Sequence, residues 1–196
     1  MNYRQEIAIL IQRVGKHPAW GINHCQRVFH MIPEISGTYV YDEEIVYIAA
    51  MLHDWGSYPG YALPNVDHAL RSKGLASSYL NELKYPQAKI PFILEAIESH
   101  MFYNEPGKSI EAILVRDADI LDFLGNVGLM RLFSIVGLDE WTSTPEDALE
   151  RARTFADALP GKVQTRLAKR IAVKRREETM RFLAGLKRQT INYKYV

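Results

Sequence analysis

Hydrophobic positions recur at every third or fourth residue along most of the chain, which is the spacing of amphipathic helices. In residues 4–14, for example, Ile7, Leu10, Ile11 and Val14 form one apolar stripe. Sustained alternation of apolar and polar residues, which is typical of half-buried strands, does not occur in the sequence. The pattern therefore predicts an all-α protein.

Turn-forming residues divide this pattern into separate helices. A second helix is expected from about Trp20 to Met31, where Pro33 should end it, and Asp42 is a suitable N-cap for a third. Residues 55–65 carry two prolines and two glycines without periodicity, so they predict a loop. Further helices are predicted over 66–83, 89–100, 110–124, 126–136, 146–158 and 162–188.

The composition is that of an ordinary folded protein. The chain has 196 residues, of which 47% are hydrophobic and 24% charged, so it suits one large domain or two small ones and excludes long disorder. Its first apolar run is too short for a secretory signal, and no stretch is long enough to cross a membrane. Cys25 is the only cysteine, which excludes an internal disulfide and fits a reducing cytoplasm. We therefore expect a cytoplasmic protein without a membrane partner.

Positive charge is concentrated near the C-terminus. The net charge is only +1, but residues 162–188 hold ten Lys and Arg against two Glu. Such a stripe can bind nucleic acid or an acidic membrane surface, or it can be the solvated outer face of a helix. Phe182 is the only aromatic residue among these charges, which argues against stacking on single-stranded nucleic acid. We favour the solvated face and do not expect a nucleic-acid partner.

Ionisable residues interrupt some of the most apolar predicted helices. Helical spacing places His53 on the stripe of Ile45, Ala49 and Leu52, and Asp54 follows it directly. Burial of such a pair is costly unless the pair is neutralised or binds a cation. A lone histidine in this place is most often a satisfied core residue, so the pair does not by itself establish a site.

A later predicted helix adds three aspartates, Asp117, Asp119 and Asp122, to apolar surroundings. Aspartate is a poor residue for the interior of a helix, and three charged acids need cations or strong donors nearby. Salt bridges to Arg116 and Arg131 would satisfy them, and so would a metal ion.

Imidazole and carboxylate together form a good ligand set for a divalent metal, and residues on separate helices can meet in the core of a bundle. The lack of a cysteine cluster disfavours a purely structural zinc site. Periodicity does not decide whether Asp117 or Asp119 is the ligand. The residues alone therefore predict a buried His/Asp cluster that holds a metal, with its reaction left open.

The order of these residues resembles the HD-domain superfamily, whose pattern is a histidine on an early helix, a His-Asp pair and a distant aspartate. The matching positions are His24 in WGINHCQRV, His53 and Asp54 in AAMLHDWG, and Asp119 in VRDADILDFLG. The resemblance implies that these four residues bind a divalent metal ion, either Mn, Mg, Fe, Co, Ni or Zn, with Asp117 as the reserve ligand.

The same resemblance implies a domain organisation. It covers roughly residues 20–136 and implies a single-domain, all-α HD-type helical bundle over residues 1–196. The remaining part, from about residue 145 to 196, would then be a helical extension of the HD core. The oligomeric state stays open.

The activity that the resemblance implies is that of a metal-dependent phosphohydrolase. Such an enzyme uses a metal-activated water to cleave a phosphate ester or anhydride of a small molecule. A nucleotide is the substrate that we favour. Asp54 would orient this water or accept its proton. His68 and His100 stand where relatives often carry further histidines, and they would line the pocket, donate a proton to the leaving oxygen or bind the phosphate.

Substrate binding is expected from residues close to this pattern. Arg71 and Lys73 are cations near His68 and would neutralise phosphate charge. Tyr58, in the loop 55–65, is a candidate for stacking on a base. Ile120 stands where many relatives have an arginine, so their substrates do not transfer directly to this chain.

Two alternatives stay open. Some superfamily members hold two irons in the same bundle and use dioxygen to cleave carbon–carbon or carbon–phosphorus bonds, and the residues for this are also present: His24, His53, Asp54, His68, His100 and Asp119. The protein would alternatively be a non-catalytic, metal-stabilised module whose basic residues 162–188 dock an acidic partner. Two equivalents of bound iron would favour the first alternative, and binding without turnover would favour the second.

Overall fold

The structure is a computed structural model that describes residues 2–194, apart from the side chain of Glu140. Within these residues the chain forms nine α-helices, three short 3-10 helices and no strand: α1 (Tyr3–Val14), α2 (Ile22–Ser36), α3 (Glu43–Leu52), η1 (Trp55–Ser57), α4 (His68–Glu82), α5 (Ile90–Glu98), α6 (Ile110–Asp122), α7 (Gly125–Phe133), η2 (Glu140–Thr142), α8 (Pro145–Ala158), η3 (Leu159–Gly161) and α9 (Arg166–Gln189). The all-α prediction is confirmed.

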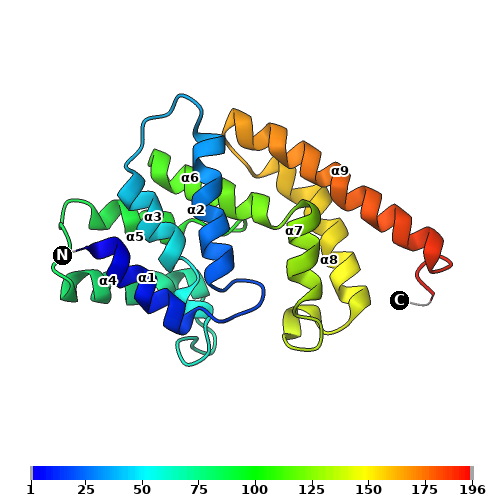
Figure 1. Ribbon diagram of the computed structural model, residues 1–196, viewed down its shortest axis with the longest axis horizontal. Helices are drawn as coiled ribbons and strands as arrows, with labels where there is room; N and C mark the ends of the chain where they lie inside the picture. The colour runs from blue at the N-terminus through cyan, green and yellow to red at the C-terminus, as the bar shows by residue number, and fades with distance from the viewer. Residues whose placement is uncertain (1, 195–196) are drawn as a thin grey trace.

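Two long-range neighbours, α2 and α6, lie side by side in the middle of the molecule (Figure 1). The helices α1, α3, α4 and α5 gather on one side of this pair, and α7, α8 and α9 lie on the other. The core helix α3 packs against α2, α5 and α6. This arrangement brings residues from the first, middle and later parts of the sequence to one place.

Capping residues explain where several helices begin. The side chain of Asp42 accepts hydrogen bonds from the backbone N–H groups of Glu44 and Ile45, as the sequence predicts for the start of α3. At α8, the side chain of Thr144 and that of Asp147 each accept a hydrogen bond from the other residue's backbone N–H, which is a capping box. These local contacts satisfy N–H groups that have no partner within the helix.

Pro33 does not end α2, contrary to the sequence prediction, because the helix continues to Ser36. The proline removes the N–H that would bond to the Phe29 carbonyl, but it lies on the exposed face of the helix, where water can replace that bond. Ile32 and Ile35 on the other face are almost completely buried. Their packing outweighs the cost of the proline.

The basic segment forms the long helix α9, which packs against α7, α8 and part of α6. Its buried residues are small or apolar, namely Ala168, Ala172, Thr179 and Leu183. Most of its cations face outward, as expected for a solvated face. What the face binds, and the division into an HD core and a C-terminal extension, stay predictions.

In residues 2–194 no helix combines the length and the apolar content that crossing a bilayer requires. The expected cytoplasmic location stays a prediction.

Candidate metal centre

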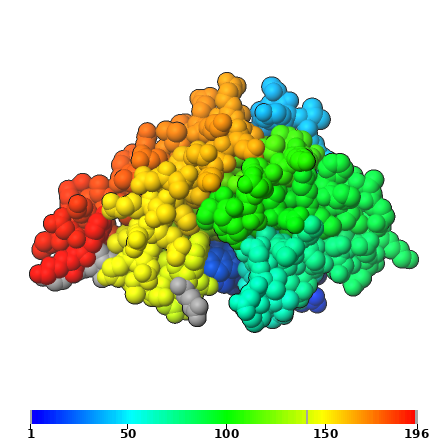
Figure 2. Space-filling view, turned by 180° about the vertical axis from the view of Figure 1, so that it is seen from behind, coloured from blue at the N-terminus to red at the C-terminus, as the bar shows by residue number. Residues whose placement is uncertain are grey.

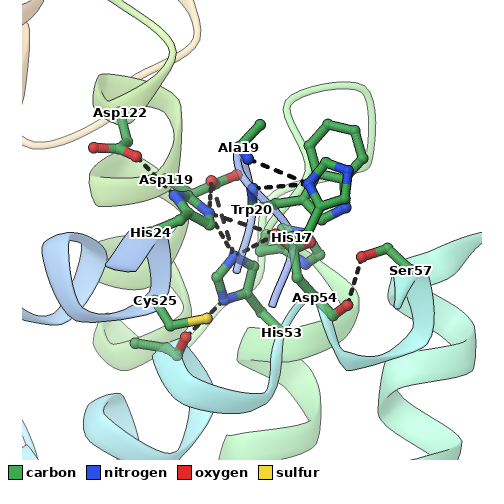
Figure 3. A network of polar contacts seen from close by, with 12 residues as sticks. His17, Ala19, Trp20, His24, Cys25, His53, Asp54, Ser57, Asp119 and Asp122 are labelled. Carbon is green, nitrogen blue, oxygen red and sulfur yellow. Dashed lines mark hydrogen bonds and ion pairs between the residues drawn. The ribbon is translucent and has the colours of Figure 1, made fainter. Parts of the chain in front are cut away.

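Three helices bring polar side chains to one buried point. His24 comes from α2, His53 directly follows α3, and Asp119 comes from α6 (Figure 3). The Nε2 atom of His24 lies 3.0 Å from Nε2 of His53 and 3.2 Å from Oδ1 of Asp119. Each of these residues is at most 1% exposed. The structure thus gathers three of the four ligands that the sequence predicts.

Asp54, the fourth, lies between this group and two further histidines. Its Oδ2 atom is 3.4 Å from Nε2 of His24 and 3.3 Å from Nε2 of His53. Its Oδ1 atom is 3.5 Å from Nε2 of His68 and 3.6 Å from Nε2 of His100. The two carboxylate oxygens of Asp54 therefore face two different sets of imidazoles.

Backbone carbonyls fix the tautomers of two of these histidines. Nδ1 of His53 donates a hydrogen bond of 2.8 Å to the Ala50 carbonyl, and Nδ1 of His100 donates one of 2.6 Å to the Ile97 carbonyl. Because a carbonyl can only accept, the proton is on Nδ1 in both rings. Each neutral ring therefore presents an unprotonated Nε2 atom to the cluster, which is the form that binds a metal.

Asp122 likewise fixes the tautomer of His24. Its carboxylate accepts a hydrogen bond of 2.7 Å from Nδ1 of His24, and it also pairs with Arg27 at 2.9 Å and Arg131 at 3.1 Å. Burial raises the pKa of the Asp122 carboxyl, but His24 and the two arginines outweigh burial and hold the pKa well below its usual range. Asp122 is therefore a charged positioning residue behind a ligand, a role that the sequence analysis did not assign.

The cluster has the properties of a cation site. The facing Nε2 atoms of His24 and His53 repel each other at 3.0 Å unless a proton or a cation lies between them. Oδ2 of Asp119 is buried and has no hydrogen-bond partner among the described residues, although an unpaired buried oxygen is costly. Ligand atoms of His24, His53 and Asp119 all lie within 4.8 Å of one another, as do those of His53, Asp54 and His100. The residues present therefore fit a divalent metal.

The pKa values report the same attraction for positive charge. Burial lowers the pKa of His53, but the neighbouring carboxylates of Asp54 and Asp119 outweigh it and raise the pKa to about 9. Burial also raises the pKa of Asp54, while the imidazoles of His53 and His100 shift it further in the opposite direction, to well below its usual range. Without a metal, protons supply the positive charge that the cluster requires.

Asp117 lies outside the cluster. Its carboxylate accepts hydrogen bonds from the backbone N–H of Gln164 at 2.8 Å and of Thr165 at 2.7 Å. Thr165 is the N-cap of α9, so Asp117 joins α6 to the beginning of the C-terminal helix. Asp119 rather than Asp117 faces the two histidines, in agreement with the resemblance.

Arg116 does not form the salt bridge to these aspartates that the sequence suggested. Its guanidinium donates to the carbonyls of Ser99 at 3.0 Å, Phe102 at 3.1 Å and Met101. It thereby anchors the segment after α5, which includes His100.

A cavity of about 350 Å³ lies next to the cluster. Figure 2 shows blue N-terminal atoms between the cyan and yellow-green surfaces, the parts of the chain that line this cavity. Asp54, Ser57 and His68 line it on the side of the cluster, and the other lining residues are Trp20, Met101, Phe102, Tyr103, Phe123, Arg131, Asp139, Trp141 and Arg151. The cavity therefore combines aromatic walls with polar residues on the side of the cluster and with further charged residues, Arg131, Asp139 and Arg151.

Tyr58 does not line this cavity. Its ring is fully buried, and its hydroxyl donates a hydrogen bond of 3.1 Å to the Trp20 carbonyl. The ring has no exposed face on which a base could stack, so this structure gives no support to the expected stacking. A loop position gave no indication of this packing, because the sequence does not show what covers the loop.

The two basic residues that the sequence predicts to bind the substrate also lie outside the cavity. Arg71 donates to the Tyr61 carbonyl at 2.9 Å, and Lys73 forms an ion pair with Glu98 at 2.6 Å. Neither residue lines the cavity. The geometry gives no support to either residue as a phosphate ligand, and the cavity contains other arginines.

A model of the HD domain matches residues 21–124, which is more than half of the chain and includes the four predicted ligands. The chain therefore belongs to the HD domain family. No curated protein matches it.

Solved structures with the same fold cover almost the whole chain. A protein from an uncultured Thermotogales bacterium, described as a predicted HD superfamily hydrolase, shares 26% identity with a TM-score of 0.67, over 94% of this chain and 91% of that one. An HD superfamily hydrolase from Bacillus thuringiensis shares 24% identity with a TM-score of 0.65, over 95% and 96%. YpgQ from Bacillus subtilis, solved in complex with ADP, shares 21% identity with a TM-score of 0.67, over 95% and 97%.

Proposed function

We propose that the protein is a metal-dependent phosphohydrolase that cleaves a phosphate ester or anhydride of a small molecule, in particular a nucleotide. The observation that carries this proposal is the position of Asp54, which faces His24 and His53 within the cluster and also lines the cavity. A substrate in the cavity would therefore meet the cluster at this carboxylate.

His24, His53, Asp54 and Asp119 would hold the ion. A divalent ion bound there supplies a Lewis acid that polarises a phosphoryl oxygen and lowers the pKa of water. Asp54, which belongs to the cluster and lines the cavity, would orient that water or accept its proton.

The two further histidines take different roles in this proposal. His68 lines the cavity, with its side chain 25% exposed, so it can contact the phosphate or the leaving oxygen. His100 is fully buried and does not line the cavity. Its Nε2 atom lies 3.4 Å from that of His68, which makes it a positioning residue or a ligand rather than a contact of the substrate.

The nucleotide part of the proposal rests on the cavity walls. A volume of about 350 Å³ lies within the range of small-molecule sites. The side chains of Trp20, Trp141, Phe102 and Phe123 border it and would give a base an apolar aromatic wall. YpgQ, which has the same fold, was crystallised with ADP, which supports a ligand of this kind.

The test is a phosphate-release screen across nucleotides and phosphate esters, with protein first analysed for bound metal and then loaded with Mn²⁺, Mg²⁺, Co²⁺, Ni²⁺ or Zn²⁺. Release by the wild type, loss in His53→Ala and retention in His30→Ala would support the proposal, because His30 is an exposed histidine on α2 outside the cluster. Circular dichroism would verify that both variants keep their helices.

Wild-type turnover rates in His53→Ala would contradict the assignment of the cluster. No release from any substrate with any ion would contradict the activity. Two equivalents of iron with a near-ultraviolet charge-transfer band would instead indicate the oxygenase.

A further inference from the structure

The two arginines that line the cavity differ in what neutralises them. Arg131 pairs with Asp122 at 3.1 Å and donates to the Ala19 carbonyl at 2.8 Å. Arg151, from α8, has no ion pair or side-chain hydrogen bond with any residue in the described part of the chain, and its buried Nε has no partner. Among the described side chains, its charge therefore has no acidic partner.

The acids nearest to Arg151 in the sequence and in the cavity do not supply such a partner. Asp139 lines the same cavity, but its carboxylate accepts the backbone N–H of Trp141 at 2.7 Å. Asp147 and Glu150 border a neighbouring hollow with Arg151. Within residues 2–194, none of the three forms an ion pair with it.

An aromatic ring holds the guanidinium in position. The Cζ atom of Arg151 lies 4.5 Å from the centre of the Trp141 ring. A cation–π contact of this kind orients an arginine but leaves its charge available. The planar fork of N–H groups matches a phosphate, to which it can donate two parallel hydrogen bonds.

The cluster and Arg151 reach the cavity from different parts of the fold. Asp54 and His68 belong to the α3–α4 side of the molecule, whereas α8 lies on the opposite side (Figure 1). An ion at the cluster would neutralise the group that is attacked, and a second anionic group of the substrate would need a second cation.

We propose that Arg151, seated on Trp141, is a second anion-binding site that selects substrates carrying two phosphate groups over those carrying one. This inference rests on the proposed function, because it takes the cavity as the substrate site. Arg151 would act on substrate binding rather than on the chemical step.

The test uses a pair of probes that are not hydrolysed, methylphosphonate and methylenediphosphonate, which carry one and two phosphonates. Their dissociation constants would be measured by calorimetry on the Mn²⁺-loaded protein at fixed free Mn²⁺. Arg151→Gln should weaken methylenediphosphonate about tenfold, the usual effect of losing a charge-assisted hydrogen bond. It should change methylphosphonate less than about twofold.

Matched variants separate charge from packing. Arg151→Lys keeps the charge and should retain part of the preference for two phosphonates. Arg151→Met keeps the aliphatic stem on Trp141 and should behave like Arg151→Gln. Arg153→Gln, an exposed position on the same helix whose side chain contacts Tyr193, should bind both probes like the wild type. Near-ultraviolet circular dichroism and Mn²⁺ affinity would verify each fold.

Equal affinities in Arg151→Gln and the wild type would overturn the inference, as would an equal loss for both probes. For a substrate found in the phosphate-release screen, Arg151→Gln should raise KM and leave kcat within about twofold. Phosphonate selectivity without phosphate release would contradict only the proposed function. Phosphate release without any effect of Arg151 would contradict only this inference.

Discussion

Nδ1 of His24 donates to the carboxylate of Asp122 across 2.7 Å, and this contact sets the face that His24 presents to the metal cluster. Asp122→Asn should therefore weaken Mn²⁺ binding about 10- to 100-fold, the usual effect of altering a residue behind a metal ligand. Competition with a chelator measures this change. Arg27→Gln, which removes one partner of Asp122 but keeps the histidine contact, should have a smaller effect. Affinity within about twofold of the wild type in Asp122→Asn would contradict the positioning role.

Metal binding should stabilise the folded protein, because ligand atoms from three helices meet only in the folded state. At a free Mn²⁺ concentration about 100 times its dissociation constant, the free energy of unfolding should rise by about 2.7 kcal/mol. For a chain of this size, that corresponds to an increase in Tm of about 5–10 °C, which differential scanning fluorimetry can measure. His30→Ala should show the same increase and His53→Ala should show little. An equal increase in both variants would place the ion elsewhere.

Asp117 should matter for stability and not for metal binding. Asp117→Ala removes the acceptor of two backbone N–H groups at the start of α9, so it should lower the free energy of unfolding by about 2 kcal/mol. Urea titration gives this value, with Asp157→Ala as the control, because Asp157 forms only an exposed ion pair with Arg176. We expect less than about 1 kcal/mol for the control. If Asp117→Ala instead abolished metal binding and left stability unchanged, Asp117 would be the ligand.

Glu95 should make a pH-dependent contribution to stability. Its carboxylate accepts backbone N–H bonds from Lys108 at 2.8 Å and Ser109 at 3.3 Å. Burial raises the pKa of Glu95, but the hydrogen bonds from Ser109 and Lys108 outweigh it and lower the pKa. A lowered pKa means that the contribution is complete above the unfolded-state pKa and is lost as the pH falls through the folded-state value.

The comparison is therefore between the wild type and Glu95→Gln. The wild type should be the more stable at about pH 6, and the difference should shrink steadily towards about pH 3. Urea titrations at several pH values, with metal removed from both proteins, measure it. A difference that stays constant over this range would show that the charge of Glu95 is not responsible.

Much of the fold was predictable because helical periodicity reports directly on burial. The stripe in α1 and the N-cap at Asp42 are confirmed. The helix end predicted at Pro33 is wrong because the local preference for a helix end is weaker than the packing of Ile32 and Ile35, which only the tertiary structure reveals. The same limit applies to Tyr58, whose burial depends on what packs over its loop.

The candidate site, too, could be predicted only in part from the sequence. The cluster could be predicted because burial of an ionisable side chain is costly without a partner. His53 is such a side chain, since it lies on an apolar stripe. The apolar surroundings of Asp122 predict a buried acid that needs a partner, but nothing in the sequence shows that this partner is His24. Arg151 and Trp141 carry no periodic signal, because their importance comes from the cavity that they complete.

The wall that contains Trp141 and Arg151 lies after the stretch that matches the HD family, whereas the predicted ligands all lie within it. A chain shortened after residue 124 would keep every proposed metal ligand and lose one side of the cavity. Under the proposed function, substitutions in the last third of the chain would alter which ligand the cavity accepts and leave the metal ligands unchanged.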